Sequence, residues 1–217
     1  MTYIQSIVEN PWFLSAWAGF AVLGVAIVGY DLIHKNAHLM PLMKLVWLLT
    51  VAYSGLIGLA IYWNTGRKQI PDDGLWRRSF RSVAHCYSGC GLGEIIGVMI
   101  TVGILGWGNL GTGITTFILA FAVGFALTLG PLLQDGVEFA TALRDTVIAE
   151  TPSIALMEVV AIGVDLVLAG SANLGDIRFW SSLVVSLTCG LFAAYPVNVL
   201  LVHFGVKEGM MDPRMTH

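Results

Sequence analysis

The residues best suited to chemistry lie at the start of one apolar stretch. They are His85, Cys86, Cys90 and Glu94. At 100° per helical residue, Cys86, Cys90 and Glu94 share one helix face, and His85 lies at the same depth as Cys86. Thiolate ligands select soft ions such as Cu(I), and imidazole accepts several metals. The spacing therefore predicts a metal site along this face, with copper as the expected ion.

Two other interpretations of the cysteines stay open. Cys86 and Cys90 are spaced CxxxC, whereas zinc ribbons and thioredoxin-type redox sites use CxxC. The thiols could cycle between dithiol and disulfide in a membrane redox protein. They could also be small buried residues that pack in a glycine-rich seam.

A second set of polar residues falls in later apolar stretches. Glu158 and Glu94 could hydrogen-bond to each other and share a proton, or pair with His85, and this arrangement suits proton-coupled transport. Cys189, Tyr195 and Asn198 lie around a proline, which frees a backbone carbonyl one turn earlier and can open a polar site in a helix. The alternatives are a neutral Glu158 bonded to a nearby hydroxyl, and a packing kink at the proline.

A third group follows the first apolar stretch. Asp31, His34 and His38 are spaced i, i+3, i+7 and share a face if the helix extends that far. Carboxylate and imidazole groups together could hold a metal ion at the outer surface. Ordinary polar residues at the membrane interface are the simpler interpretation.

The elements that must position these residues are transmembrane helices. The chain is 56% hydrophobic and only 12% charged, whereas soluble domains have about 25% charged residues. In hydrocarbon every backbone amide must be paired, and the chain lacks the alternating polarity of a barrel. We therefore expect an all-α membrane bundle of about six transmembrane helices. The apolar spans are 11–33, 42–63, 83–106, 112–131, 152–170 and 179–203.

The basic residues predict how such a bundle lies in the membrane. Six crossings would leave eight Lys and Arg on the side of the termini and three on the other side, which predicts cytoplasmic termini in a multi-pass protein of the inner (plasma) membrane. The eight are Arg67, Lys68, Arg77, Arg78, Arg81, Arg144, Lys207 and Arg214, and the three are Lys35, Lys44 and Arg178. A net charge of -3 gives no sign of a nucleic-acid partner.

A stripe of glycines runs beside the thiol-bearing face. Gly89, Gly93 and Gly97 recur every four residues, and such a stripe lets another backbone come close. We expect it to pack within the bundle or against a membrane-protein partner or second copy, with the lipid bilayer around the rest.

Four patterns in the sequence are shared with a known family. They are Met40-Pro41-Leu42-Met43-Lys44-Leu45-Val46-Trp47 with the following residues to Gly55, His85-Cys86-x-x-Gly89-Cys90-x-Leu92-Gly93-Glu94, Met157-Glu158, and Ala194-Tyr195-Pro196-Val197-Asn198 running to Gly205-Val206-Lys207-Glu208. On these residues the chain resembles, over roughly 40–210, the bacterial and archaeal membrane family catalogued as domain of unknown function 4396. The family usually has Ser and often Asp where this chain has Ala84 and Glu94. The resemblance implies a membrane protein with a polar core and a role in handling metals.

These observations give one division of the chain and three functional hypotheses. We expect an N-terminal transmembrane helix with its outer loop (1–39), a family-like domain of five transmembrane helices (40–210) and a tail (211–217). The first hypothesis is binding or transport of a soft, copper-like metal. The alternatives are an accessory or assembly subunit of a larger membrane complex and a membrane thiol redox protein. No set of nucleophile, base and orienting group is evident, so no enzymatic activity is expected.

Overall fold

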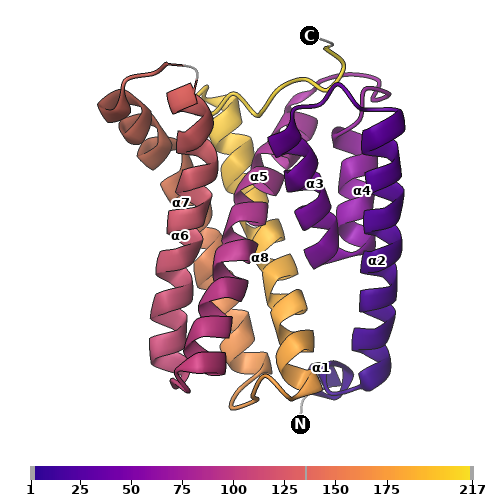
Figure 1. Ribbon diagram of the computed structural model, residues 1–217, viewed down its shortest axis with the longest axis vertical. Coiled ribbons are helices and arrows are strands. Elements are labelled where there is room, and N and C mark those ends of the chain that lie inside the picture. Colours follow the sequence, from indigo (N-terminus) through magenta and orange to yellow (C-terminus); the bar gives the residue numbers. More distant parts are fainter. Residues whose placement is uncertain (1–2, 135, 216–217) are drawn as a thin grey trace.

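A computed structural model describes residues 3–134 and 136–215, and all regular structure in these residues is helical (Figure 1). Five helices, counting α5 and η1 as one, are long and apolar enough to cross a membrane. The helical membrane bundle expected from composition is therefore confirmed. The elements are α1 (Tyr3–Val8), α2 (Pro11–His34), α3 (Pro41–Ser54), α4 (Leu56–Thr65), α5 (Leu75–Val98), its π-helical continuation η1 (Met99–Ile104), α6 (Asn109–Gln134), α7 (Phe139–Leu168) and α8 (Ile177–His203).

The expected second crossing is a helical hairpin instead. Gly55 has φ +55°, a left-handed conformation that glycine adopts without a steric penalty, and it separates α3 from α4. Beyond it the chain turns back, so that Tyr62 of α4 packs on Trp47 of α3 with ring centroids 5.3 Å apart. The described residues therefore have five long apolar helices where about six were expected, because this apolar span folds back on itself.

Contacts between the two connections of the hairpin place them at the same end of the bundle. Asn36, in the segment after α2, accepts a hydrogen bond from the Lys68 amide at 2.8 Å and donates one to Gln69 at 3.3 Å. Five crossings then leave the N- and C-termini at opposite ends, as Figure 1 shows. This arrangement differs from the expected one, in which both termini lie on the same side.

The hairpin also changes the charge balance between the two ends. Lys35 and Lys44 move to the end that carries the C-terminus. Of the 11 Lys and Arg residues in the chain, only Arg178 belongs to the N-terminal end. The asymmetry is much sharper than the eight against three expected from six crossings.

A buried ion pair fastens the hairpin to α2. Asp31 accepts hydrogen bonds from Arg67 Nε at 3.0 Å and Nη2 at 3.1 Å, and Tyr62 Oη and Asn36 Nδ2 each donate to it at 2.7 Å. Both charged side chains are buried, so the paired geometry compensates for the hydration they lose.

The central helix is α5, which packs against α3, α4, α6, α7 and α8. Gly89 and Gly93 lie so close to α6 that a β-carbon on either would meet α6 backbone atoms at Gly124 and at Leu119. Gly97 faces Thr116 of the same helix. The glycine stripe is therefore covered by α6 within the chain, and the structure does not support an oligomer or partner interface through it.

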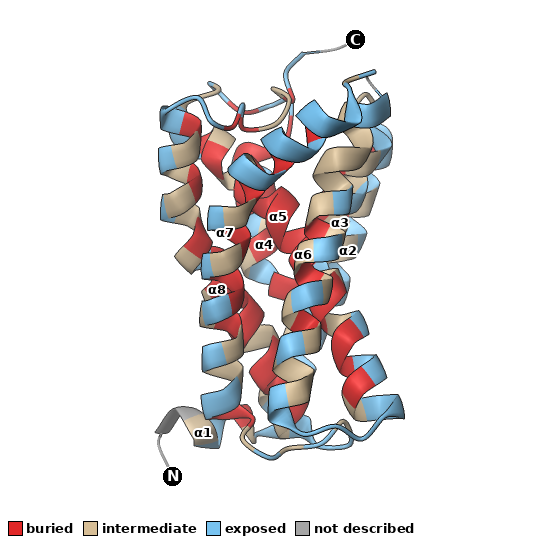
Figure 2. Ribbon diagram, turned by 90° about the vertical axis from the view of Figure 1, so that its left-hand side faces the viewer, coloured by how far each residue is buried: buried red, intermediate tan, exposed pale blue. Residues whose placement is uncertain are grey.

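The long helices have exposed outer faces (Figure 2), and many of the residues exposed there are large and apolar. Large side chains such as Val22, Leu110, Ile118 and Val159 are more than half exposed. Such a surface suits contact with lipid, where aliphatic side chains need no cover.

Loss of the ion pair should loosen the hairpin. We expect Asp31→Asn to lower the free energy of unfolding by about 3–5 kcal/mol, because Arg67 would remain buried without a counter-charge. Urea unfolding in a mild detergent, followed by circular dichroism, measures the loss. The control is Asp212→Asn, which affects an ion pair with the surface residue Arg214; equal losses in the two variants would contradict the proposed role of Asp31.

Candidate functional site

Five buried polar side chains meet where α5, α7, α8 and the C-terminal segment converge. We call Ser82, Cys86, Glu150, Asn198 and Lys207 the lysine cluster. The Lys207 ammonium nitrogen Nζ lies 2.7 Å from Glu150 Oε2, 3.2 Å from Cys86 Sγ and 3.2 Å from Asn198 Oδ1. Each side chain of the cluster is less than a tenth exposed.

Every polar group of the lysine cluster has a partner. The Cys86 thiol donates to Glu150 Oε2 at 2.7 Å, and Thr128 donates to Glu150 Oε1 at 3.2 Å. Asn198 accepts from Ser82 at 2.8 Å and donates to Ser153 at 2.6 Å. A fully bonded network of this kind is stable in a bundle that excludes water.

Lys207 is the charged centre of this network and lies beyond the end of α8. Burial acts to lower the pKa of Lys207, but Cys86 and the Glu150 carboxylate outweigh it and raise the pKa above its ordinary value. The side chain is therefore a stable cation.

A second group of buried residues lies deeper in the bundle, and some of its polar atoms have no hydrogen-bond partner among the described residues. We call Cys90, Glu94 and Glu158 the acid cluster. Cys90 and Glu158 are fully buried and Glu94 is 3% exposed. Cys90 is adjacent to Glu158, and the two carboxyl groups are close enough to interact electrostatically. Neither oxygen of Glu158, nor Oε2 of Glu94, has a hydrogen-bond partner among the described residues.

The acid cluster adjoins a cavity at the N-terminal end of the bundle. The cavity holds about 190 Å³ and is lined by Glu94, Asp165 and Thr116. Residues of the loop before α6 and of the loop between α7 and α8, among them Trp107 and Asn173, complete its wall. Asp165 accepts a hydrogen bond from Ser182 at 2.6 Å. We call this cavity the vestibule.

Helical spacing aligns the two clusters and the vestibule. On α5, Cys86, Cys90 and Glu94 are spaced four residues apart. At ~1.5 Å per residue, they extend over about 12 Å along the helix axis. On α7, Glu150 lies eight residues before Glu158, which places the two on one face. We call the resulting line of side chains, from the vestibule to Lys207, the polar file.

The predicted metal ligands are divided between these groups. Cys86 bonds to Glu150 and Lys207, Cys90 and Glu94 belong to the acid cluster, and buried His85 faces the Leu127 backbone of α6. Among the described residues, no three His, Cys, Asp or Glu side chains are grouped to hold a metal ion. The structure therefore gives the predicted copper site no support. All three cysteines are free.

The other predicted polar residues, Asn198, Tyr195 and Cys189, lie in different surroundings. Asn198 is central to the lysine cluster. Tyr195 instead stacks on Phe80 with centroids 4.0 Å apart, and Cys189 is half-buried with a free thiol. The helix α8 continues through Pro196, so the proline does not divide it.

The predicted outer group does not meet at one point. Asp31 belongs to the ion pair with Arg67. His34 is exposed and stacks on Tyr30 at 4.2 Å, and His38 Nε2 lies 2.7 Å from the Pro213 carbonyl oxygen. All three lie at the end of the bundle that carries the C-terminus.

Sequence reasoning missed Glu150 and Lys207. Glu150 precedes the predicted span of residues 152–170 and looked like a loop residue, although its spacing from Glu158 is a usable signal. Lys207 falls in the shared pattern that ends at Gly205-Val206-Lys207-Glu208, but its partners could not be predicted, because they depend on how the segment after α8 folds back.

Removing the charge of Glu150 alone should destabilise the fold. We expect Glu150→Gln to reduce the free energy of unfolding by about 3 kcal/mol, since Lys207 stays buried without a counter-charge, and Lys207→Met in the same chain should restore most of the loss. A double-mutant cycle in detergent measures the coupling. For comparison, Arg178→Ala breaks the partly exposed pair with Glu9 and should cost less than about 1 kcal/mol. Additive losses in the cycle would show that Glu150 and Lys207 are not coupled.

Comparison with known proteins gives one match. A family model described as a domain of unknown function, DUF4396, matches residues 75–207. No curated protein and no solved structure matches the chain. The match begins at the first residue of α5 and ends at Lys207, so it contains the whole polar file, and the chain belongs to the DUF4396 family.

Proposed function

We propose that this protein carries protons across the membrane along the polar file. The observation that carries the proposal is Glu158, a fully buried carboxyl group with neither oxygen hydrogen-bonded among the described residues. An isolated ionised carboxylate is very costly in such surroundings, and intramembrane acids commonly belong to ion paths and proton relays. Glu158 therefore needs a proton or another cation, and a group that must hold one can also pass it on.

The neighbours of Glu158 supply a route for the proton. From the vestibule, Asp165 and Glu94 come first, Glu158 follows, and Cys90 lies beside it. The side chains alternate between α5 and α7, so each step joins two packed helices. At the far end, the Lys207–Glu150 ion pair closes the route in this conformation.

The distribution of basic residues supports an orientation for this route. Ten of the 11 Lys and Arg side chains belong to the end with the C-terminus, which favours a cytoplasmic C-terminus and an external N-terminus under the positive-inside rule. In the inner (plasma) membrane, the vestibule would then face outward and Lys207 the cytoplasm.

A soft metal ion is the second candidate cargo. The observation that favours it is the presence of two free thiols, Cys86 and Cys90, four residues apart within the polar file. Cu(I) binds to few ligands and prefers sulfur, so a pair of thiols could pass it along.

Proton movement should depend on Glu158. Purified protein in liposomes, with a pH gradient and with valinomycin and K⁺ to balance charge, should acidify an enclosed dye faster than empty liposomes do. Glu158→Gln keeps the shape but not the exchangeable acid, and should lower the rate to that of empty liposomes. The matched control is Glu138→Gln at an exposed position, which should keep the original rate. An unchanged rate in Glu158→Gln, or no acidification by the original protein, would refute the proposal.

The metal candidate makes a separate prediction. Protein purified after exposure of the cells to copper should retain the metal, and the double substitution Cys86→Ser, Cys90→Ser should remove it, because the thiols are the soft ligands. Elemental analysis measures the content, with Cys189→Ser as the control. The metal candidate fails if copper is absent or if the double variant retains it.

A further inference from the structure

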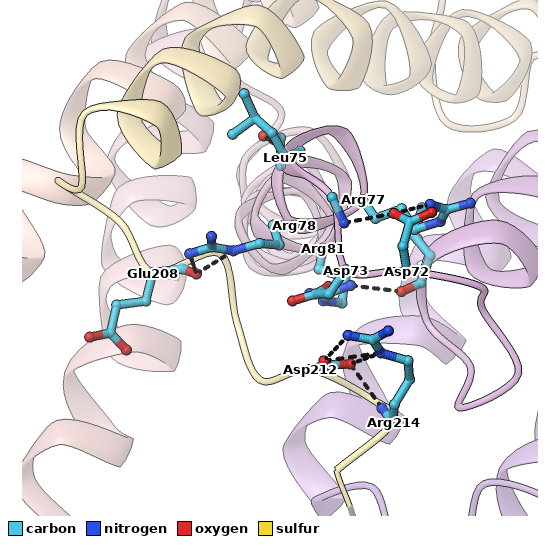
Figure 3. Close-up of polar contacts among 12 residues, drawn as sticks. Asp72, Asp73, Leu75, Arg77, Arg78, Arg81, Glu208, Asp212 and Arg214 are labelled. Atoms are coloured by element: carbon cyan, nitrogen blue, oxygen red, sulfur yellow. Dashed lines mark hydrogen bonds and ion pairs between the residues drawn. The ribbon is translucent and has the colours of Figure 1, made fainter.

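The segment that carries Lys207 is a short strap laid across the end of the bundle. Residues 204–215 follow α8 and run back over the start of α5 (Figure 3). Arg78 donates to the Glu208 carbonyl oxygen at 2.7 Å, and the Pro213 carbonyl oxygen lies 2.7 Å from His38. We call this segment the strap.

The contacts around Lys207 match the chemistry of an ammonium group. An ammonium group carries three N–H donors and no acceptor. Glu150 Oε2, Cys86 Sγ and Asn198 Oδ1 surround Nζ at 2.7–3.2 Å. Three acceptors thus face three donors, and one carboxylate balances one positive charge.

The three residues that surround the Lys207 ammonium group belong to helices, whereas Lys207 itself belongs to the strap. We call the space between these three residues the pocket. Cys86 is on α5, Glu150 on α7 and Asn198 on α8, each fixed by further hydrogen bonds or by helix packing. Lys207 lies in the strap just after α8, and its backbone amide donates a hydrogen bond to the Leu201 carbonyl oxygen of that helix at 3.1 Å. Gly205 has φ +72° and Gly209 φ +78°, so glycines with left-handed backbones flank the lysine on both sides. Gly205 ends α8, since its amide donates to the Val202 carbonyl oxygen, and Gly209 packs against Arg78, so the two glycines let the chain turn back over the bundle.

We infer that Cys86, Glu150 and Asn198 form a binding site for a small ammonium-type cation, and that Lys207 is the occupant supplied by the chain itself. Ammonium or a primary amine is the ligand class, because it repeats the charge and the donors of the lysine. A transition metal fits less well, since the pocket offers only one thiol and one carboxylate as metal ligands.

The site lies at the end of the polar file, where Lys207 closes the proposed proton route. The inference extends the proposed function to a second ligand. Binding is measured without any flux, so the two proposals can fail separately.

Chemical rescue of a lysine deletion tests the site. In Lys207→Ala, the pocket is vacated and Glu150 loses its counter-charge. Methylammonium chloride should raise the apparent melting temperature of purified Lys207→Ala by about 5 °C when it is present well above its dissociation constant. The melting temperature of the original protein should hardly change, because Lys207 fills the pocket and methylammonium can bind only to the small fraction of molecules in which the strap has opened. Tetramethylammonium chloride at the same ionic strength has no N–H donors and should have no effect.

A second substitution shows whether the ligand uses Glu150. Adding Glu150→Gln to Lys207→Ala should abolish the shift. A shift that persists, or a shift of equal size with tetramethylammonium, would overturn the assignment. A shift with Ag(I) and none with methylammonium would replace it with a soft-metal site.

Hydrogen exchange in the original protein provides a measurement that does not depend on a variant folding. Methylammonium should compete with Lys207 and release the strap, so that amides of residues 204–215 exchange several-fold faster than in tetramethylammonium. The amides of α3, which do not contact Lys207, serve as the internal control. Equal exchange of the strap in the two salts, together with no rescue of Lys207→Ala, would refute the site.

Discussion

Polar side chains inside an apolar bundle have no water to bond to, and this constraint organises the whole structure around α5. The helix carries Ser82, Cys86, Cys90 and Glu94, and each must find its partner in protein. Other helices enclose α5 for this reason, and its glycines let α6 approach closely enough to exclude lipid from the polar face. The helix is thus the axis of the bundle and also the source of half the polar file.

The two clusters meet the constraint in opposite ways. The lysine cluster is complete: each donor has an acceptor, and the single carboxylate faces a single ammonium. The acid cluster is incomplete, with carboxyl oxygens that have no partner among the described residues. Complete networks hold a structure in place, whereas an unpaired buried acid calls for a proton or a ligand. This contrast is why transport is assigned to Glu158 and closure to Lys207.

The hairpin of α3 and α4 packs against α5 and also determines where the basic residues lie. A helix pair that enters and leaves at one end supplies packing surface for α5 without crossing the membrane. Its attachment through Asp31 and Arg67 also gathers the basic residues at the end where the strap lies, beside Asp72, Asp73 and Asp212 (Figure 3). Arg78 of α5 donates to the Glu208 carbonyl oxygen of the strap, so movement of the strap would break a contact with α5.

The sequence by itself determined the all-α membrane class, because low charge content and long apolar spans leave no other stable arrangement in lipid. It also determined that Cys86, Cys90 and Glu94 share one face, since that follows from helical periodicity, and Glu158 was recognisable as an acid inside a span. The tertiary structure alone decided that the span from 42 to 63 turns back at Gly55, because hydropathy does not record backbone direction. It alone decided that Cys86 faces Glu150 and Lys207. Those contacts join residues 64 and 121 positions apart, and only the packing of α5 against α7 and α8 brings such distant residues together.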